Sequence, residues 1–269
     1  MEEAVTQLAP SGSSPSLADT QNRSLFTQGL LPVVGRTPVR YGVGVATDLR
    51  SRLGMPTVRA PLPVAPSLLS LFADGGVVRG RTVVCTGDAA LSMALAVSAA
   101  ATRAGSWLAV VGVPHLGVGA AVEAGVAIER LVLAQPPMAS REWATTVAAL
   151  VEGFDVLIVA PPVSLTEHDA RRLQSRIVAR QSVLLAVNVP GALPTSRTSS
   201  DASRMGGNAS RVFAGDLDVH AETVSWSGIE RGGSHITQRL VHVRVGGRRC
   251  PVPREATLDL SCVTNQHAS

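Results

Sequence analysis

The sequence predicts a mixed α/β fold: a mostly parallel, twisted sheet flanked by helices and continued by C-terminal antiparallel strands. Short runs of Val, Leu and Ile alternate with helix-length segments from residue 81 to residue 189. Beyond Pro190, apolar and polar residues alternate, which is typical of antiparallel strands. Hydrophobic residues make up 45% of the chain and aromatic residues only 3%, so Ala, Val and Leu must fill the core.

Five apolar runs give the predicted parallel strands, and a helix-length segment follows each of the first four. The strands are expected at 81–86, 107–113, 130–134, 155–160 and 182–189, and the helices at 89–103, 120–129, 141–152 and 165–180. Parallel strands need right-handed crossover connections, so the helices should flank the sheet. The segments 218–226 and 238–245 are the predicted antiparallel strands, with a turn at Gly246-Gly247.

The chain divides into a tail, an arm and a core. Residues 1–24 combine Ser, Pro, Gly and Gln with few large apolar side chains, which predicts a disordered tail. Residues 25–61 form an N-terminal arm that carries several arginines and is too broken by Gly and Pro for a long helix. The core is expected over 62–262, and residues 246–269 contain its last strand and a polar end that could dock a partner.

The N-terminal sequence and the length of the apolar stretches favour a cytoplasmic protein that does not enter a membrane. The N-terminus lacks a basic segment followed by an apolar run, and no stretch reaches the ~20 apolar residues that span a bilayer. The three cysteines lack C-x-x-C spacing and the six histidines lack ligand spacing, so we expect neither disulfides nor a metal site. The net charge of +4 permits contact with nucleic acid or acidic protein without requiring it.

A strand followed by Gly87 and a helix is the setting of a phosphate-binding loop. Aligned on G-x-x-x-x-G-K-[ST] from Gly87, the chain has Ser92, Met93 and Ala94 in place of the second glycine, the lysine and the hydroxyl that binds Mg²⁺. No other register restores the lysine, because all 24 basic residues of the chain are arginines. We therefore predict a degenerate phosphate loop without a nucleotide cofactor, although weak anion binding by its backbone amides stays open.

The order of elements over residues 62–260 resembles the core of RecA-type recombinases. The segment Gly206-Gly207-Asn208-Ala209 is similar to the G-G-N-A that ends the second DNA-binding loop of that family. The resemblance implies that Met93, Pro114 and Ala160 stand at the positions of the lysine, the catalytic glutamate and the metal-binding aspartate. A RecA-type sheet would continue into antiparallel strands after Pro190, unlike a generic dinucleotide-binding fold. The resemblance implies a RecA-like fold that is not an enzyme.

Among RecA-like proteins that have lost ATP chemistry, the chain is most similar to the ImuA and ImuA-prime family. The similarity lies in a composition that is rich in Ala and has Arg in place of Lys. It also lies in an N-terminal extension and in a nearly complete RecA-like C-terminal part. It implies an adaptor in DNA-damage-induced mutagenesis, the translesion synthesis of the SOS response. The implied partners are an ImuB-like relative of Y-family polymerases and a DnaE-type error-prone polymerase, with RecA and single-stranded DNA as further partners.

Three alternatives stay open at the level of the sequence. A SulA-like inhibitor of cell division would bind FtsZ, and fold alone does not separate it from the adaptor. A protein that binds single-stranded DNA or the RecA filament would use similar surfaces. A nucleotide hydrolase with a rearranged site is the enzyme alternative.

Two groups of arginines are candidates for interaction. Arg197, Arg204 and Arg211 belong to the counterpart of a DNA-binding loop and could contact phosphates, but an ordinary surface loop is the favoured alternative because stacking aromatics are scarce. Arg248, Arg249 and Arg254 are candidates for partner docking in the C-terminal stretch, with a last strand and frayed end as the alternative. Trp143 opens a predicted helix and could be exposed.

Overall fold

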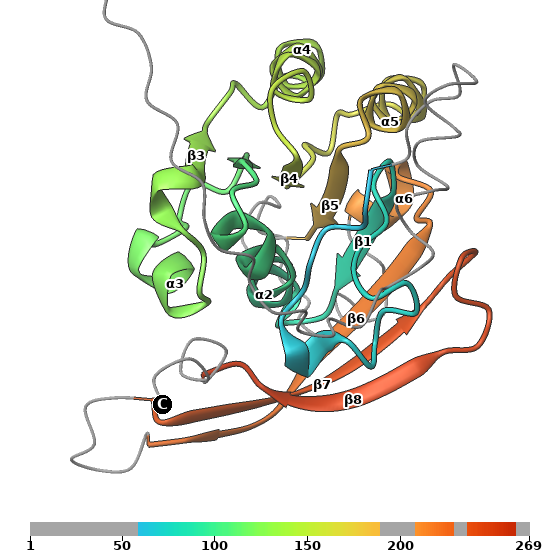
Figure 1. Cartoon of the computed structure of the whole chain (residues 1–269). Coiled ribbons are helices and arrows are strands. Elements are labelled where there is room, and N and C mark those ends of the chain that lie inside the picture. Colours follow the sequence, from blue (N-terminus) through green and yellow to red (C-terminus); the bar gives the residue numbers. More distant parts are fainter. Residues whose placement is uncertain (1–58, 189–207, 229–235, 262–269) are drawn as a thin grey trace, which may run out of the picture. The chain divides into compact units, whose positions relative to one another are not determined.

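The computed structural model describes residues 59–188, 208–228 and 236–261 (Figure 1). The predicted tail at 1–24, nearly all of the predicted arm and the last residues from 262 lie outside these ranges. The described residues belong to one of the two units into which contacts divide the chain, Val58–Ser269. None of the helices described is long and apolar enough to cross a membrane.

A single eight-stranded sheet organises this unit, with the strand order β3-β2-β4-β5-β1-β6-β7-β8. Its strands are β1 (Thr82–Thr86), β2 (Leu108–Val111), β3 (Leu131–Ala134), β4 (Val156–Val159), β5 (Val183–Val187), β6 (Leu217–Ser227), β7 (Gln238–Gly246) and β8 (Arg254–Asp259). Strands β1 to β6 run parallel, whereas β6, β7 and β8 pair antiparallel. The predicted fold class, including the C-terminal antiparallel strands, is confirmed.

Strand β1 lies inside the sheet, between β5 and β6. In register, Val83 pairs with Leu185 of β5 on one side and with Leu217 of β6 on the other. All of β5 and most of β1 are buried, as expected for parallel strands covered on both faces. In the centre of β1, burial raises the pKa of the Cys85 thiol to about 12.

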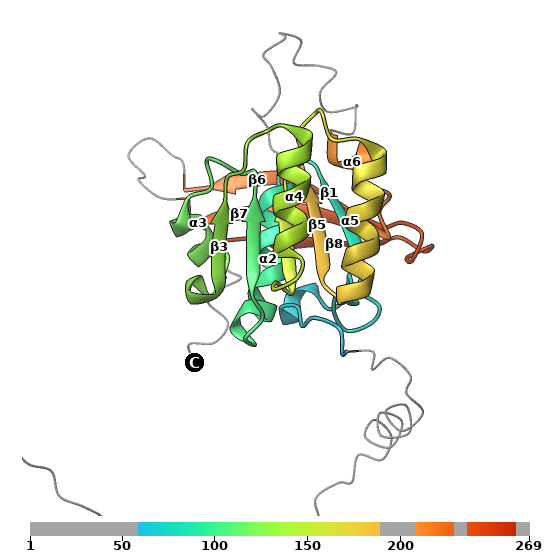
Figure 2. The ribbon, with the colours of Figure 1, turned by 90° about the horizontal axis from the view of Figure 1, so that it is seen from above.

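Helices cover the two faces of the sheet (Figure 2). They are α2 (Ala90–Arg103), α3 (Val118–Glu123), α4 (Ser140–Leu150), α5 (Glu167–Arg180) and α6 (Asn208–Val212). The buried side chains of α2 and α3 belong to one apolar cluster, and those of α4, α5 and α6 belong to another. Two short 3-10 turns, η1 (Pro66–Leu68) and η2 (Ile128–Arg130), complete the described elements.

Local sequence signals explain where α5 begins and ends. The hydroxyl of Thr166 accepts a hydrogen bond from the backbone N–H of Asp169 at 3.2 Å, which caps the first turn. Gln181 ends the helix in the left-handed conformation, with φ of 55°. The buried residues Leu173 and Ile177 are spaced by four, so one stripe of the helix faces the sheet.

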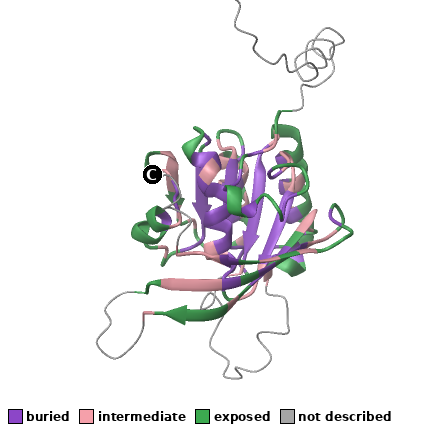
Figure 3. Ribbon diagram, turned by 60° about the horizontal axis from the view of Figure 1, so that its bottom comes forward, coloured by how far each residue is buried: buried purple, intermediate pink, exposed green. Residues whose placement is uncertain are grey.

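Two expectations from the sequence were wrong in detail. The predicted helix at 120–129 is split into α3 and the turn η2, because Gly125 adopts φ of +84° and stops the helix. Trp143 is fully buried rather than exposed, since it projects from the first turn of α4 into the apolar cluster that also holds Val147. Figure 3 shows buried residues concentrated in the parallel strands and exposed residues on the outer antiparallel strands.

Candidate functional site

The loop after β1 is short and tightly packed at Gly87. This glycine has φ of +92°, and a Cβ atom there would lie 2.0 Å from the carbonyl oxygen of Ala221 in β6. Helix α2 begins at Ala90, so Ser92, Met93 and Ala94 lie within the helix rather than in a loop. Met93 is fully buried in the core. The degenerate phosphate loop predicted from the sequence therefore has only Gly87, Asp88 and Ala89 outside regular structure.

The side chain of Asp88 turns toward the neighbouring strands. Its Oδ1 accepts a hydrogen bond from the backbone N–H of Thr223 at 2.8 Å, and its Oδ2 lies 3.7 Å from Nη2 of Arg239. Burial opposes ionisation of this carboxyl, but the bonds with Thr223 and the charge of Arg239 outweigh it and lower the pKa of Asp88. The carboxylate is thus fixed beside the start of α2.

The guanidinium group of Arg239 contacts four side chains beside the start of α2. Its Nη1 donates to the hydroxyl of Ser92 at 2.8 Å, and its Nε and Nη2 donate to the hydroxyl of Thr223 at 3.2 and 3.0 Å. Its guanidinium also stacks on the ring of Trp226, 4.4 Å from the ring centroid. We call Asp88, Ser92, Thr223, Trp226 and Arg239 the closed cluster.

The backbone amides of Ala89 and Ala90, two and three residues after Gly87, are also partnered within the chain. The N–H of Ala89 donates to the carbonyl of Ala221 at 3.1 Å, and the N–H of Ala90 donates to the carbonyl of Gly87 at 3.3 Å. A phosphate bound at this loop would meet the Asp88 carboxylate and would have to displace these hydrogen bonds.

The other positions implied by the RecA resemblance also lie at the carboxyl ends of the strands. Pro114 follows β2 and is exposed, and Ala160 follows β4 and is buried. Asp155 lies at the opposite end of β4, as the sequence predicts, where its Oδ1 is 2.6 Å from Nη1 of Arg79. Neither Pro114 nor Ala160 offers a side chain that could ligate a metal or transfer a proton.

Two asparagines hold the ends of the segment 189–207 together. Asn188, after β5, accepts a hydrogen bond from the backbone N–H of Ala209 at 2.9 Å. Asn208 donates through Nδ2 to the carbonyl oxygens of Pro161 and Pro162, which follow β4. We call this pair the asparagine clasp.

Of the three candidate DNA-contacting arginines, Arg197 and Arg204 belong to segment 189–207 and Arg211 follows it. Arg197 and Arg204 lie outside the described residues, and Arg211 is exposed on α6. The structure therefore places one of the three, close to where the segment returns to the sheet.

A polar relay crosses from β1 to β6 at this edge. The Thr86 hydroxyl lies 2.9 Å from Nδ1 of His220, and Nε2 of His220 lies 3.0 Å from Oε1 of Glu222. Such a chain can pass a proton between a hydroxyl and a carboxylate. The side chains of His220 and Glu222 are both largely exposed, which favours an ordinary surface ion pair.

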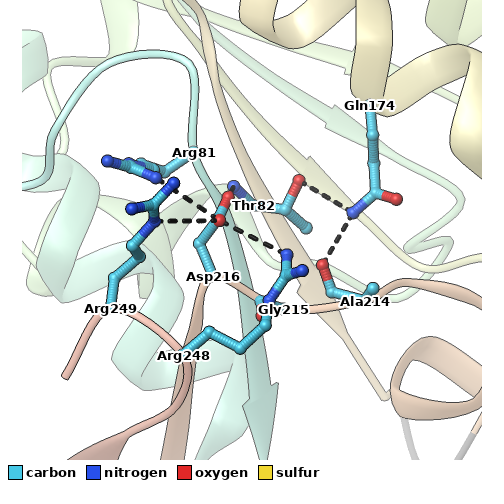
Figure 4. A network of polar contacts seen from close by, with 8 residues as sticks. All are labelled: Arg81, Thr82, Gln174, Ala214, Gly215, Asp216, Arg248 and Arg249. Atoms are coloured by element: carbon cyan, nitrogen blue, oxygen red, sulfur yellow. Dashed lines mark hydrogen bonds and ion pairs between the residues drawn. The ribbon is translucent and has the colours of Figure 1, made fainter. Parts of the chain in front are cut away.

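The opposite end of β1 carries a cluster of arginines around Asp216 (Figure 4). Arg81 precedes β1, whereas Arg248 and Arg249 belong to the turn between β7 and β8. Gln174 of α5 donates to the Thr82 hydroxyl at 3.3 Å and to the carbonyl of Ala214 at 2.8 Å, which fixes the segment before Asp216. The backbone N–H of Arg249 donates to the Asp216 carbonyl at 3.0 Å.

The predicted docking arginines lie in the last strand of the sheet or in the turn before it. Arg254 is the first residue of β8, and its Nη1 donates to the carbonyl of Ser70 at 3.1 Å. The sequence left open whether Arg248, Arg249 and Arg254 dock a partner or belong to a last strand with a frayed end. The last strand is present, because β8 begins at Arg254 and pairs with β7 over its whole length, whereas docking by these arginines stays a prediction. Arg248 and Arg249 meet Arg81 at Asp216, and the sequence did not single out Arg81.

Sequence reasoning also missed Arg239, Asp216 and His220. Each lies on or beside the antiparallel strands, and each meets a partner more than 130 positions earlier in the chain. The alternating pattern of β6 and β7 indicated strands, but nothing in it indicated which residues of β1 and α2 they would face. Within the described ranges, no group of three or more His, Cys, Asp or Glu side chains could hold a metal ion.

Fold and sites together define a mixed α/β protein whose parallel strands end in a closed polar cluster and whose opposite edge carries arginines. Residues 70–192 match the family model of the MT3502 N-terminal domain. This stretch runs from before β1 to just beyond β5, so it contains the loop at Gly87 and the whole parallel part except β6. No curated protein matches the chain.

Proposed function

We propose that this protein is a non-catalytic, RecA-fold adaptor of DNA-damage-induced mutagenesis that acts in the cytoplasm and binds an ImuB-like polymerase relative. The strand order supports a RecA-type core. Strand β1 lies between β5 and β6, and the sheet continues into antiparallel β7 and β8. A doubly wound dinucleotide-binding sheet, with the order 3-2-1-4-5-6, lacks this continuation.

One observation carries the non-catalytic part of the proposal: the closed cluster fills the start of α2. Asp88 and Arg239 pair there with each other, with Ser92 and with Thr223, and Met93 points into the core. A P-loop instead offers free amides and a lysine to the phosphates. The closed cluster and the buried Met93 argue against ATP binding at this place.

We infer the adaptor role from the resemblance to the ImuA and ImuA-prime family and from the exposed arginines on the described surface. A protein without nucleotide chemistry would act by binding, and Arg211, Arg248 and Arg249 are exposed arginines that a partner can reach. A DnaE-type error-prone polymerase, RecA and single-stranded DNA are the further partners that we propose, and FtsZ would replace them if the protein were a SulA-like inhibitor.

Binding to purified ImuB from the same organism tests the proposal. We expect the full-length chain to bind it at micromolar concentration or below, with no Mg²⁺-dependent ATP turnover above that of a buffer control. The experiment includes a truncation after Ser261, which keeps β8 and separates the terminal residues from the sheet. Binding to purified FtsZ but not to ImuB would transfer the proposal to cell division, and measurable ATP turnover would overturn it.

A further inference from the structure

The two edge strands of the sheet differ in how they meet solvent. Strand β8, at one end of the strand order, carries Arg254, Glu255 and Asp259 among its six residues. Strand β3, at the other end, reads Leu-Val-Leu-Ala and is only partly buried, whereas the parallel strands β2, β4 and β5 are buried throughout. Charged side chains on an edge strand hinder its pairing with another chain. Strand β8 is protected in this way, and β3 is not.

The backbone of β3 points away from the sheet at Leu133. The carbonyl of Ala134 accepts a hydrogen bond from the N–H of Gly112, which follows β2, at 3.0 Å. Alternate residues of a parallel strand direct their backbone groups to opposite sides, so Ala134 binds β2 while Leu131 and Leu133 face outward. The N–H of Leu131 already donates to the carbonyl of Ile128. Leu133 therefore presents both its N–H and its C=O at an edge where no described strand pairs.

Exposed apolar side chains surround this edge on one face of the sheet. Leu131 packs against the apolar cluster of α2 and α3, so Leu133, two residues later, projects from the same face. Helix α3, which lies beside β3 in Figures 1 and 2, adds Val118 and Val122, and the turn η2 adds Ile128. Each of these residues except Leu131 is 40% to 51% exposed. We call Val118, Val122, Ile128 and Leu133 the β3 edge face.

The charges around the β3 edge face sum to zero. The carboxylates are Glu123 of α3 and Glu129 of η2. The cations are Arg130 of η2 and Arg103, whose guanidinium lies next to Gly125 in the turn after α3. A surface with a large net charge would repel an identical copy, whereas this surface would not. An apolar face without net charge therefore fits a second copy of the same chain better than it fits a strongly acidic or basic partner.

We propose that two copies of this chain associate through their β3 edges as a symmetric dimer. A twofold axis perpendicular to the sheet sets the two β3 strands antiparallel and places both copies of α3 on the same face. With Leu133 on the axis, the N–H of each Leu133 donates to the Leu133 carbonyl of the other copy, and the two β3 edge faces cover each other. This inference goes beyond the proposed adaptor role and does not depend on which partner the adaptor binds.

The small size of the β3 edge face limits the strength of this dimer. Each copy contributes a short strand and four half-exposed side chains, whereas stable interfaces bury about 1,200–2,000 Å² in total. We therefore expect a reversible dimer with a Kd on the order of 10 µM. Association should stop at the dimer, because a twofold contact uses the same surface on both copies.

Sedimentation velocity of the full-length chain from about 1 to 100 µM tests the dimer. We expect the wild type to change from monomer to dimer in this range. Leu133→Glu should weaken dimerisation at least about tenfold, because it places two carboxylates opposite each other on the axis. The control is Val178→Glu, which adds the same charge at a 62% exposed valine of α5 and should dimerise like the wild type.

A cysteine crosslink tests the register of the two strands, in a Cys262→Ser background because the other two cysteines are buried. Leu133→Cys places two thiols opposite each other, at a Cα separation of about 5.5 Å that a disulfide can bridge. In the matched control Val132→Cys, the mutated residue faces Ala134 of the other copy, and its two thiols lie on a diagonal of about 7–8 Å. We expect mild oxidation to give a covalent dimer from Leu133→Cys and little from Val132→Cys.

A wild-type chain that stays monomeric up to about 100 µM, or a dimer that Leu133→Glu leaves intact, would overturn the proposal. Assemblies that keep growing with concentration would also overturn it, because they need a head-to-tail contact instead of a twofold one. A monomer in which purified ImuB from the same organism protects the Leu133→Cys thiol from alkylation would assign the edge to a strand of that partner instead.

Discussion

The two ends of β1 carry polar clusters of opposite character. At the carboxyl end, a single arginine, Arg239, is surrounded by a carboxylate, two hydroxyls and an aromatic ring, with donor distances of 2.8 to 3.2 Å to the hydroxyls. At the amino end, one carboxylate oxygen of Asp216 faces three arginines at 3.5 to 3.9 Å. The first cluster satisfies its own charges, and the second does not. We therefore expect the first cluster to contribute more to the stability of the fold than the second.

The largest effect should follow from breaking the closed cluster. We expect Arg239→Ala to lower the free energy of unfolding by about 2–3 kcal/mol, because Asp88, Ser92 and Thr223 lose a charged donor and Trp226 loses its cation. Arg244→Ala is the matched control on the same strand. Arg244 is 59% exposed and pairs only with Glu255 among the described residues, so its loss should change stability by less than about 0.5 kcal/mol.

Urea unfolding followed by circular dichroism measures both variants. Equal stability of Arg239→Ala and Arg244→Ala would show that the closed cluster contributes no more than an exposed ion pair.

The next effect should come from the charge of Asp216. Asp216→Asn keeps an oxygen that can accept from the N–H of Thr82, but it leaves three arginines without a counter-charge. We expect a loss of about 1 kcal/mol at low salt that shrinks as salt screens the repulsion among the guanidinium groups. A loss that does not change with the salt concentration would contradict this explanation.

A smaller effect should appear as a pH dependence at the closed cluster. The pKa of Asp88 is lowered in the folded protein, so its ionised form stabilises the fold above the unfolded carboxyl pKa of about 4. That contribution is lost as the pH falls below about 4 and through the folded value. Between about pH 5 and pH 2, unfolding of Asp88→Asn should therefore depend less steeply on pH than unfolding of the wild type. Parallel curves for the two proteins would contradict this.

The smallest effect on stability should come from Arg248 and Arg249. Arg248→Gln/Arg249→Gln removes two exposed cations from a shared carboxylate, and we expect the free energy of unfolding to change by less than about 0.5 kcal/mol. A thermal melt checks this, with Arg141→Gln/Arg171→Gln as the control because it removes two exposed charges from α4 and α5. A clear destabilisation would place these arginines with Arg239 as structural residues and weaken the contrast between the clusters.

Local sequence pattern was enough to predict the parallel part of the sheet. Apolar runs such as 81–86 and 155–160 became β1 and β4 with their ends moved by one residue or so, because buried parallel strands need uninterrupted apolar residues. The burial of Trp143 could also have been predicted, since Trp143, Val147 and Val151 are spaced by four and all three are buried.

Both polar clusters depend on long-range pairing that the sequence does not encode locally. Arg239 reaches Thr223 only because β6 and β7 pair in one register, with a bulge between Thr223 and Ser225. A shift by one residue would turn the Arg239 side chain to the other face of the sheet. The three arginines at Asp216 likewise come from the segment before β1 and from the turn after β7, which only the finished sheet brings together.

The asparagine clasp has a consequence for engineering and for evolutionary change. Asn188 and Asn208 fix the last described residue before position 189 and the first described residue after position 207 by hydrogen bonds of their own. Doubling the length of a closed loop costs only about 0.6 kcal/mol in chain entropy. A change in chain length between these two fixed points would therefore leave the hydrogen bonds of both asparagines in place.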